Sequence, residues 1–195
     1  MTETTKYIGG EYKVLQQFGG AMGHVFLVEK QGIGFPFVLK SYQDIKPHLE
    51  ELFFTEVKNW TSFGVHQNIV KTLFAEKFDG KIFVAAEFVE GNENGENRLT
   101  NYIRKNLPLH LIIKWAVQFS YGMNHCLGKG MIAHSDIKPD NILIDKDLNL
   151  KITDFGLSKS YLNDEHSGGG TAMYFSPEQI YNSEKIDYRS DIYSF

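Results

Sequence analysis

The residues best suited to chemistry lie in one short stretch, residues 134–141, which reads His-Ser-Asp-Ile-Lys-Pro-Asp-Asn. Asp136 could accept a proton from a hydroxyl, and Lys138 could offset negative charge that develops in a transition state. Asn141 offers an amide oxygen, and Asp154 follows thirteen residues later, directly before Phe and Gly. Carboxylate and amide oxygens are ligands suited to Mg²⁺. A base, a cation and two hard oxygen ligands are groups that phosphoryl transfer can use.

This combination resembles the protein kinase family, in which an Asp-x-Lys-Pro-x-Asn loop is followed at this distance by Asp-Phe-Gly. By this resemblance, Asp136 takes the proton of the substrate hydroxyl and Lys138 offsets charge on the transferred group. Asn141 and Asp154 would hold Mg²⁺ at the phosphates of ATP. Lys138, together with Thr171 further on, favours serine and threonine as acceptors. The alternative is that both aspartates are solvated turn carboxylates, which the joint spacing of the two motifs disfavours.

A glycine-rich turn lies upstream, 17 residues before Lys40, between two expected strands. It is similar to the hairpin that covers the phosphates in the family. Gly20 and Gly23 fall on the second and third glycine positions of that hairpin, Phe18 occupies the first, and Gly19 restores some flexibility. Taken alone, the motif is also compatible with an ordinary glycine-rich β-turn.

Lys40 ends the segment Phe-Val-Leu-Lys, which resembles the family's third-strand lysine segment. The resemblance implies that this lysine contacts the α- and β-phosphates and is held by a glutamate on a helix. Glu56 is the candidate, because it precedes the segment 66–70 by the usual family distance. Glu50 and Glu51 compete for the same role.

Adenine needs apolar faces and backbone hydrogen bonds. The resemblance implies that Val25 and Val38 cover one face of the base and that Leu143 covers the other. It also implies that the backbones of Glu87 and Val89 meet the adenine edge as a hinge. The alternative is that the three apolar residues are ordinary core residues.

Residues 170–178 resemble the end of a kinase activation segment, where a peptide substrate docks. Ser135 stands where many family members carry an arginine beside the catalytic aspartate. That arginine binds a phosphate on the activation loop through charge-assisted hydrogen bonds, which serine cannot form. The chain therefore resembles a non-RD kinase, and its activity is expected to be independent of such a phosphate.

The elements that position these residues follow from the hydrophobic pattern. Within the helix at 109–127, the expected apolar positions are Ile112, Val117, Phe119 and Met123. The pattern predicts strands in the first third of the chain, a helix at 47–63, strands at 69–78 and 81–88 joined by Asp79-Gly80, a helix at 109–127, and short strands at 142–144 and 150–152.

These elements predict an α+β fold, and the resemblance makes it a bilobal, protein-kinase-like fold. Residues 1–10 are expected to form an N-terminal tail and residues 11–195 a protein kinase domain. Its N-lobe, an antiparallel β-sheet, would span 11–90, and a truncated helical C-lobe would span 91–195.

The C-lobe is expected to be partial, because residues 190–195 resemble the start of the central helix of that lobe. Ile112, Trp115 and Phe119 would then lose part of their cover. Exposed apolar patches tend to mark interfaces. The chain is therefore expected to self-associate, to bind a partner there, or to fill the gap with a rearranged segment of its own.

Net charge, cysteine content and the N-terminal sequence indicate which partners and which setting to expect. The 195 residues carry a net charge of −4, which gives no global electrostatic reason to expect nucleic acid or an anionic membrane as partner. The single cysteine, Cys126, and a polar N-terminus favour a cytoplasmic setting. The sequence thus indicates an ATP- and Mg²⁺-dependent kinase acting on a protein substrate. The alternative is a catalytically impaired kinase remnant that serves as a nucleotide-binding scaffold or decoy.

Overall fold

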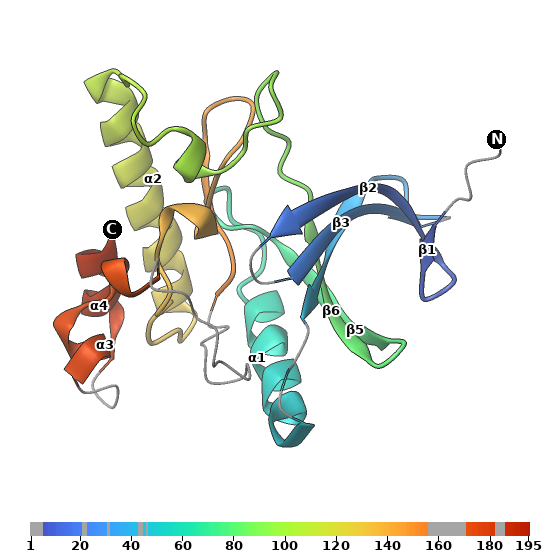
Figure 1. The fold of residues 1–195 in the computed structure, drawn as a ribbon. Coiled ribbons are helices and arrows are strands. Elements are labelled where there is room, and N and C mark those ends of the chain that lie inside the picture. Colours follow the sequence, from blue (N-terminus) through green and yellow to red (C-terminus); the bar gives the residue numbers. More distant parts are fainter. Residues whose placement is uncertain are drawn as a thin grey trace. The chain divides into compact units, whose positions relative to one another are not determined.

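The computed structural model describes residues 6–20, 23–30, 32–42, 45, 47–155, 171–181 and 186–195. The chain divides into two compact units. The first contains residues 1–61 and 71–88, and the second contains residues 62–70 and 89–195. A β-sheet dominates the first unit and helices dominate the second (Figure 1), so the predicted α+β class is confirmed.

The first unit contains a six-stranded antiparallel sheet among its described residues, in the order β1-β2-β3-β4-β6-β5. Its long central hairpins come from alternating apolar residues separated by glycine-rich turns, as the pattern predicts. The strands are β1 Tyr7–Ile8, β2 Tyr12–Gly20, β3 Gly23–Lys30, β4 Phe37–Tyr42, β5 Thr72–Phe78 and β6 Lys81–Glu87.

One face of this sheet carries the core of the first unit. Because side chains alternate between the two faces of a strand, every second residue of β3, β4 and β6 points into this core. The core includes Phe26, Val28, Phe37, Leu39, Phe83 and Ala85.

The hairpin between β5 and β6 forms as predicted. Asp79 and Gly80 both have positive φ, at 49° and 77°. A two-residue turn with two positive φ angles matches the twist of the flanking strands, which is why Asp-Gly is favoured there.

The sheet begins within the segment that the sequence assigns to a tail. Tyr7 and Ile8 form β1 and pair with Lys13 and Tyr12 of β2. Ile8 is buried in the sheet's core. A two-residue strand is too short to produce a periodic pattern, so the hydrophobic pattern does not indicate it.

A 3₁₀ turn, η1 (Pro47–Leu49), leads into helix α1 (Glu50–Ser62). Phe53, Val57 and Trp60 are its buried residues. Their spacing of four and three places them on one face, as predicted.

The second unit is mainly helical. Its 20-residue helix α2 follows a proline, which occupies the N-cap position. The elements of this unit are η2 Leu99–Asn101, α2 Leu109–Gly128, η3 Pro139–Asn141, β7 Ile142–Ile144, β8 Leu150–Ile152, η5 Thr171–Tyr174, α3 Pro177–Tyr181 and α4 Tyr188–Ser194.

The four apolar positions named for α2 fall on two sides of the helix. Ile112 and Val117 are nearly half exposed, at 48% and 47%, whereas Phe119 and Met123 are buried. The helix is apolar on two faces, and the pattern alone does not distinguish the buried face from the exposed one. The buried face consists of Leu111, Trp115, Phe119, Gly122, Met123 and Cys126.

The segment 62–70 belongs to the second unit, although the sequence places it in the N-lobe. Backbone hydrogen bonds explain this difference. Val70 N–H donates to the Ile152 carbonyl at 2.8 Å, and Ile152 N–H donates to the Asn68 carbonyl at 2.9 Å. The Asn68 side chain adds a bond to the Leu150 carbonyl at 2.8 Å.

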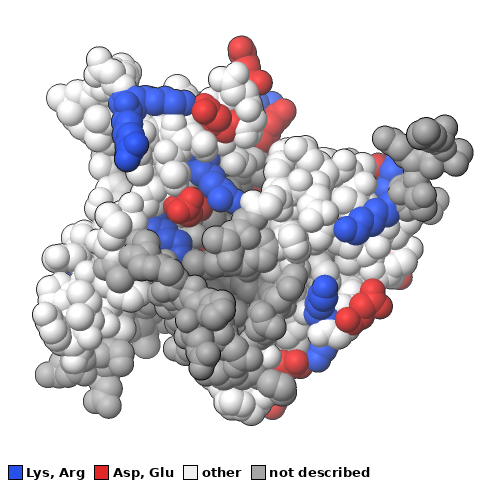
Figure 2. Space-filling model, viewed as in Figure 1, with Lys and Arg blue, Asp and Glu red and all other residues white. Residues whose placement is uncertain are grey.

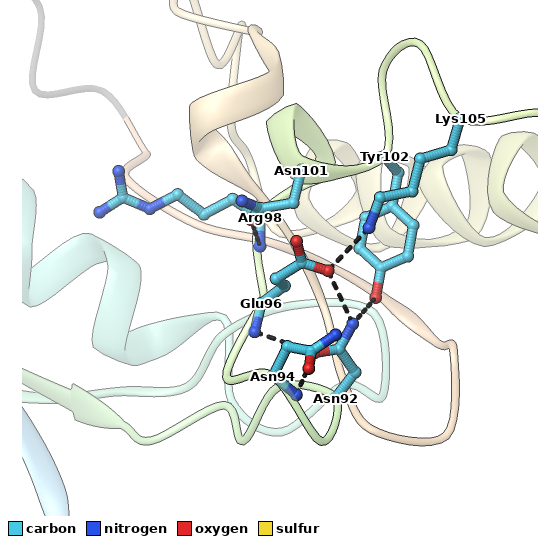
Figure 3. A network of polar contacts seen from close by, with 7 residues as sticks. All are labelled: Asn92, Asn94, Glu96, Arg98, Asn101, Tyr102 and Lys105. Carbon is cyan, nitrogen blue, oxygen red and sulfur yellow. Dashed lines mark hydrogen bonds and ion pairs between the residues drawn. The ribbon is translucent and has the colours of Figure 1, made fainter.

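The polar stretch that begins at Asn92 is an ordered turn (Figure 3). The Asn92 side-chain oxygen accepts from the backbone N–H groups of Asn94 and Glu96 at 2.9 and 3.0 Å. Glu96 accepts from Lys105 Nζ at 2.7 Å, and this bond is the main cause that lowers the pKa of Glu96. Side chains of this kind hold a turn by bonding to nearby backbone.

No helix within the described ranges combines the length and the apolar character needed to cross a membrane.

Candidate functional site

The loop before η3 brings three of the predicted site residues into direct contact. Lys138 Nζ donates to Asp136 Oδ2 at 2.7 Å, and Asn141 Nδ2 donates to the same oxygen at 2.8 Å. Asn141 Nδ2 also donates to the Asp136 carbonyl at 2.8 Å. The Lys138 and Asp136 side chains are only 7% and 17% exposed. The carboxylate is therefore held at a fixed position beside a cation in a poorly solvated loop.

The local sequence explains this geometry. Lys138 is extended, with φ −159° and ψ 161°, as expected for a residue before proline. Pro139 then begins η3, and Asn141 N–H donates to the Lys138 carbonyl at 2.9 Å. This tight turn folds Asn141 back onto Asp136.

Asp154 follows β8 and is linked to the same loop through the backbone. Strands β7 and β8 pair Ile142 with Ile152, and Thr153 N–H donates to the Asn141 carbonyl at 3.0 Å. Asp154 itself has φ 62°, in the left-handed region that costs a non-glycine residue energy. Gly156, which completes the motif, lies outside the described residues.

The aromatic rings beneath the loop are close-packed. His134 is fully buried, and its Nε2 donates to the Thr153 carbonyl at 2.9 Å. Its ring lies 4.8 Å from that of Phe155, which in turn lies 5.6 Å from Phe63. These contacts fix the residues on either side of Asp154.

Asp191 holds the loop from α4, and the sequence patterns do not identify it. Its two carboxylate oxygens accept from His134 N–H at 2.7 Å and from Ser135 N–H at 2.8 Å. Burial raises the pKa of Asp191, while the His134 ring and the two backbone donors act in the opposite direction. No local pattern signals this role, because the partners of Asp191 lie more than fifty residues away in sequence.

Charged side chains also lie at the outer edge of the loop. Arg98 Nη1 is 3.9 Å from Asp140 Oδ1, and Thr100 Oγ1 donates to the same oxygen at 3.0 Å. Figure 2 shows basic and acidic side chains gathered over this part of the second unit. Asp140 is therefore compensated by partners on and beside η2.

Glu178, at the end of the predicted activation segment, is also hydrogen-bonded. Ser190 Oγ donates to Glu178 Oε1 at 2.6 Å. This bond is the first cause that lowers the pKa of Glu178. It joins α3 to α4 within the second unit.

In the first unit, four of the predicted nucleotide-binding positions form the β2–β3 hairpin. Gly20 pairs with Gly23, Gly19 pairs with His24, and Phe18 pairs with Val25. The glycine-rich stretch is thus the end of a β-hairpin, as the sequence predicts. The two residues at its tip lie outside the described residues.

Val25, Val38 and Lys40 share the face of the sheet opposite the core. Val25 pairs with Lys40, and Leu27 pairs with Val38, across antiparallel β3 and β4. Each of these residues alternates with a core residue such as Phe26 or Leu39 and is half-buried. The lysine and the two valines therefore face the same side of the sheet.

The three glutamates of α1 are in different settings. Glu50 accepts from Lys77 Nζ through both oxygens, at 2.9 and 2.8 Å. Glu51 is exposed, whereas Glu56 is half-buried. Glu50 is thus paired with Lys77, and Glu56 is less exposed than Glu51.

The predicted hinge residues end one element and begin the next. Glu87 ends β6 and donates its backbone N–H to the Lys71 carbonyl at 2.9 Å. Val89, in the second unit, is buried, and its carbonyl accepts from Asn97 Nδ2 at 2.9 Å. Leu143 is half-buried in β7, where it pairs with Lys151.

The chain is similar to known proteins over nearly all of its length. Residues 12–195 match the family model described as protein kinase domain. The chain is 32% identical to the serine/threonine-protein kinase PrkC of Bacillus subtilis, over 97% of this chain and 30% of that protein. It is 30% identical to the probable serine/threonine-protein kinase CPE1738 of Clostridium perfringens, over 97% of this chain and 28% of that protein. The chain thus spans about a third or less of these relatives.

The fold has a close counterpart among solved structures. The PknI kinase domain of Mycobacterium tuberculosis superimposes with a TM-score of 0.71 and 20% sequence identity. The match covers 100% of this chain and 74% of that one.

Proposed function

Because the chain belongs to the protein kinase family, we propose that it transfers the γ-phosphoryl group of ATP to serine and threonine hydroxyls of protein substrates. The observation that carries this proposal is the contact set around Asp136, which joins a base, a cation and an amide in one loop. The relatives PrkC and CPE1738 are both named as serine/threonine kinases, which supports the same acceptor class.

In this mechanism Asp136 is the base and the orienting group. The substrate hydroxyl donates to the carboxylate, its oxygen bonds to the γ-phosphorus, and its proton passes to Asp136 as the bond to the β-phosphate oxygen breaks. Lys138 stabilises the charge that spreads over the transferred group. Asp136 and Lys138 lie 2.7 Å apart, so the base and the cation are held beside each other.

Asn141 and Asp154 would hold Mg²⁺. Asn141 directs its amide nitrogen to Asp136, which leaves the amide oxygen to meet a cation. An amide oxygen and a carboxylate fit the hard oxygen preference of this ion. An ion held there would supply positive charge to neutralise that of the phosphates.

In the first unit we assign phosphate positioning to Lys40, held by Glu56, and to the β2–β3 hairpin. Phosphate oxygens accept readily from backbone N–H groups, and glycine allows the backbone to approach them closely. The hairpin positions concerned are Phe18, Gly19, Gly20 and Gly23.

The adenine ring would contact Val25 and Val38 on one face and Leu143 on the other. Its edge would meet the backbones of Glu87 and Val89. The Val89 carbonyl accepts from Asn97, and we assign the Val89 N–H to adenine.

The second candidate is a catalytically impaired remnant that binds nucleotide as a scaffold or decoy. The relatives are several times longer than this chain, so other parts of such proteins could carry the activity. The complete set of Lys40, Asp136, Asn141 and Asp154 opposes this alternative, since a decoy has no chemical need for all four.

Labelled ATP distinguishes the two candidates. The purified chain is incubated with γ-labelled ATP, Mg²⁺ and a generic protein substrate, beside Asp136→Ala. An active kinase labels the substrate and the variant does not. Nucleotide binding by both proteins with no labelling by either would favour the remnant.

For partners, we propose a protein substrate, with neither nucleic acid nor membrane as a partner. We also propose self-association, or binding of another protein, through the exposed apolar face of α2. A cytoplasmic setting agrees with the supply of ATP and with the buried Cys126 thiol, whose pKa burial raises to about 12. A thiol with such a pKa is not a nucleophile at neutral pH.

A further inference from the structure

Gln179 in α3 uses both ends of its side-chain amide. Its Oε1 accepts from the backbone N–H of Ser176 at 3.0 Å. Its Nε2 donates to the carbonyl of Ser135 at 2.8 Å, across 44 residues of sequence. The second bond joins α3 directly to the loop that contains Asp136.

The first bond has an ordinary structural explanation. Ser176 and Gln179 form a capping box, in which Gln179 N–H also approaches Ser176 Oγ at 3.4 Å. Such a box needs only an acceptor on the fourth residue, so glutamate serves as well as glutamine. Capping therefore does not explain why the amide nitrogen is directed to Ser135.

Ser135 is a residue whose backbone needs support. Its φ of 67° lies in the left-handed region, which is unfavourable for a residue with a side chain. Asp191 accepts its N–H at 2.8 Å, and Gln179 donates to its carbonyl. The two peptide groups that flank Ser135 are thus both held by side chains.

The carbonyl that Gln179 holds belongs to the peptide group that leads into Asp136. Rotation of this peptide plane would turn the Asp136 carboxylate away from Lys138 and from an incoming hydroxyl. We propose that Gln179 is a positioning residue for phosphoryl transfer, which acts by holding the Ser135 carbonyl and thereby orienting Asp136. This inference rests on the proposed function of Asp136 as the base.

The Gln179–Ser135 bond also bears on regulation. Both of its groups are uncharged, so the bond forms without a phosphate. It links α3, which begins within the predicted substrate-docking segment, to the loop that contains Asp136. Gln179 thus provides a connection that needs no phosphate, in a chain whose Ser135 cannot bind one through charge.

Two substitutions at the same position separate positioning from capping. Gln179→Glu keeps the acceptor for Ser176 and removes the donor to Ser135. Gln179→Lys keeps a donor for Ser135 and removes the acceptor for Ser176. Initial rates with ATP-Mg²⁺ and a peptide give kcat and KM, and thermal unfolding gives Tm.

The proposal predicts that Gln179→Glu lowers kcat about tenfold, equal to about 1.4 kcal/mol of barrier, with KM for ATP unchanged. The kcat of Gln179→Lys should be at least about threefold higher than that of Gln179→Glu. The Tm of Gln179→Lys should be the lower of the two, because this variant loses the helix cap. The proposal would be overturned if Gln179→Glu had the kcat of the unmodified chain. It would also be overturned if the kcat of Gln179→Lys were lower than that of Gln179→Glu. Loss of the fold in Gln179→Glu would overturn it as well, because the retained cap is expected to hold α3.

Failure of the proposed function is recognised separately. If the unmodified chain transfers no phosphate, the function is wrong, and hydrogen exchange then tests the Gln179–Ser135 bond. The bond predicts faster exchange of the amides of residues 134–141 in Gln179→Glu than in Gln179→Lys. Equal exchange in the two variants would contradict it.

Discussion

Asp136 receives both of its side-chain donors on a single oxygen. Lys138 and Asn141 both donate to Oδ2, at 2.7 and 2.8 Å. The other oxygen, Oδ1, is then the atom on which a substrate hydroxyl would be received. Two charge-assisted bonds fix the direction of that oxygen, which is the requirement for general-base catalysis at a defined acceptor.

The Lys40–Glu56 pair gives the first prediction at the residue scale. If Glu56 acts by holding Lys40 on the phosphates, then Glu56→Gln should lower kcat/KM strongly in the unmodified chain. It should have little further effect in a Lys40→Met background, since the group that it positions is gone. Steady-state rates of the four proteins measure this coupling.

Glu51→Gln is the matched control, because Glu51 is an exposed glutamate on the same helix. It should leave kcat/KM within about twofold of the unmodified chain. Independent, additive effects of Lys40→Met and Glu56→Gln would show that Glu56 is not the partner. A structure with bound nucleotide in which Lys40 meets neither phosphate nor Glu56 would exclude the pairing as well.

At the scale of elements, the activation segment gives the second prediction. Activity should be independent of a phosphate on this segment, because Ser135 carries no charge to bind one. Phosphatase treatment should therefore lower the rate by less than about tenfold, or about 1.4 kcal/mol of barrier. A larger fall would show that a phosphate supports activity. The candidate acceptors are Ser158, Ser160, Tyr161 and Ser167, which lie outside the described residues, and Thr171.

The third prediction concerns the turn after α1 and its contact with the end of α2. The rings of His66 and His125 are stacked 4.6 Å apart, and His66 Nδ1 accepts from Asn68 N–H at 3.2 Å. Burial, followed by the neighbouring His125 and Lys151, lowers the pKa of His66. The folded protein therefore favours the neutral ring, which alone can accept the Asn68 bond.

The sign of the pH effect follows from this lowered pKa. As the pH falls below about 6.5, His66 is protonated in the unfolded chain before it is protonated in the folded one. The stability that neutral His66 contributes is therefore present above that pH and is lost as the pH falls through the pKa of the folded protein. Urea unfolding gives the free energy of unfolding at about pH 7.5 and about pH 5.5. This free energy should fall less between the two pH values in His66→Gln than in the unmodified chain. Equal losses would contradict this assignment.

Much of the element order could be predicted from the sequence, because α1, β7, β8 and the β5–β6 hairpin each carry a local signal. The grouping of Asp136, Lys138 and Asn141 could also be predicted, since residues 134–141 span only eight positions. Asp191 and Gln179 could not, because their contacts with Ser135 cross 56 and 44 residues. Local patterns do not encode such long-range contacts.

At the scale of the whole molecule, the loss of apolar cover that the sequence predicts is only partly found. Trp115 and Phe119 are both 4% exposed, so the expectation was wrong for them. Phe195 stacks on Phe119 with ring centroids 3.9 Å apart, and thus supplies cover from the end of α4. Ile112 remains 48% exposed, in agreement with the prediction.

An apolar stripe nevertheless remains on α2. Its members are spaced mostly by three or four residues, so they lie on one side of the helix. All are 47% to 70% exposed, which is unusual for so many large apolar side chains together. The stripe consists of Leu109, Ile112, Ile113, Val117 and Tyr121.

This stripe gives the fourth prediction. The 195-residue chain should self-associate at about micromolar concentration, because pairing the stripes of two copies removes apolar surface from water. Val117→Lys should shift the species toward monomer in light scattering, whereas Gln67→Lys, which adds the same charge at an exposed polar position, should not. An unmodified chain that stays monomeric at all concentrations would contradict this use of the stripe.

Asp136→Asn tests the central claim most directly. Asparagine keeps the size of the side chain but cannot take up a proton at neutral pH, so binding of ATP should persist while transfer fails. We predict that label transfer from γ-labelled ATP to serine and threonine falls roughly 10²–10⁴-fold in the variant, with ATP affinity retained. Equal transfer by the variant and the unmodified chain would show that Asp136 is not the base, and the proposed mechanism would be wrong.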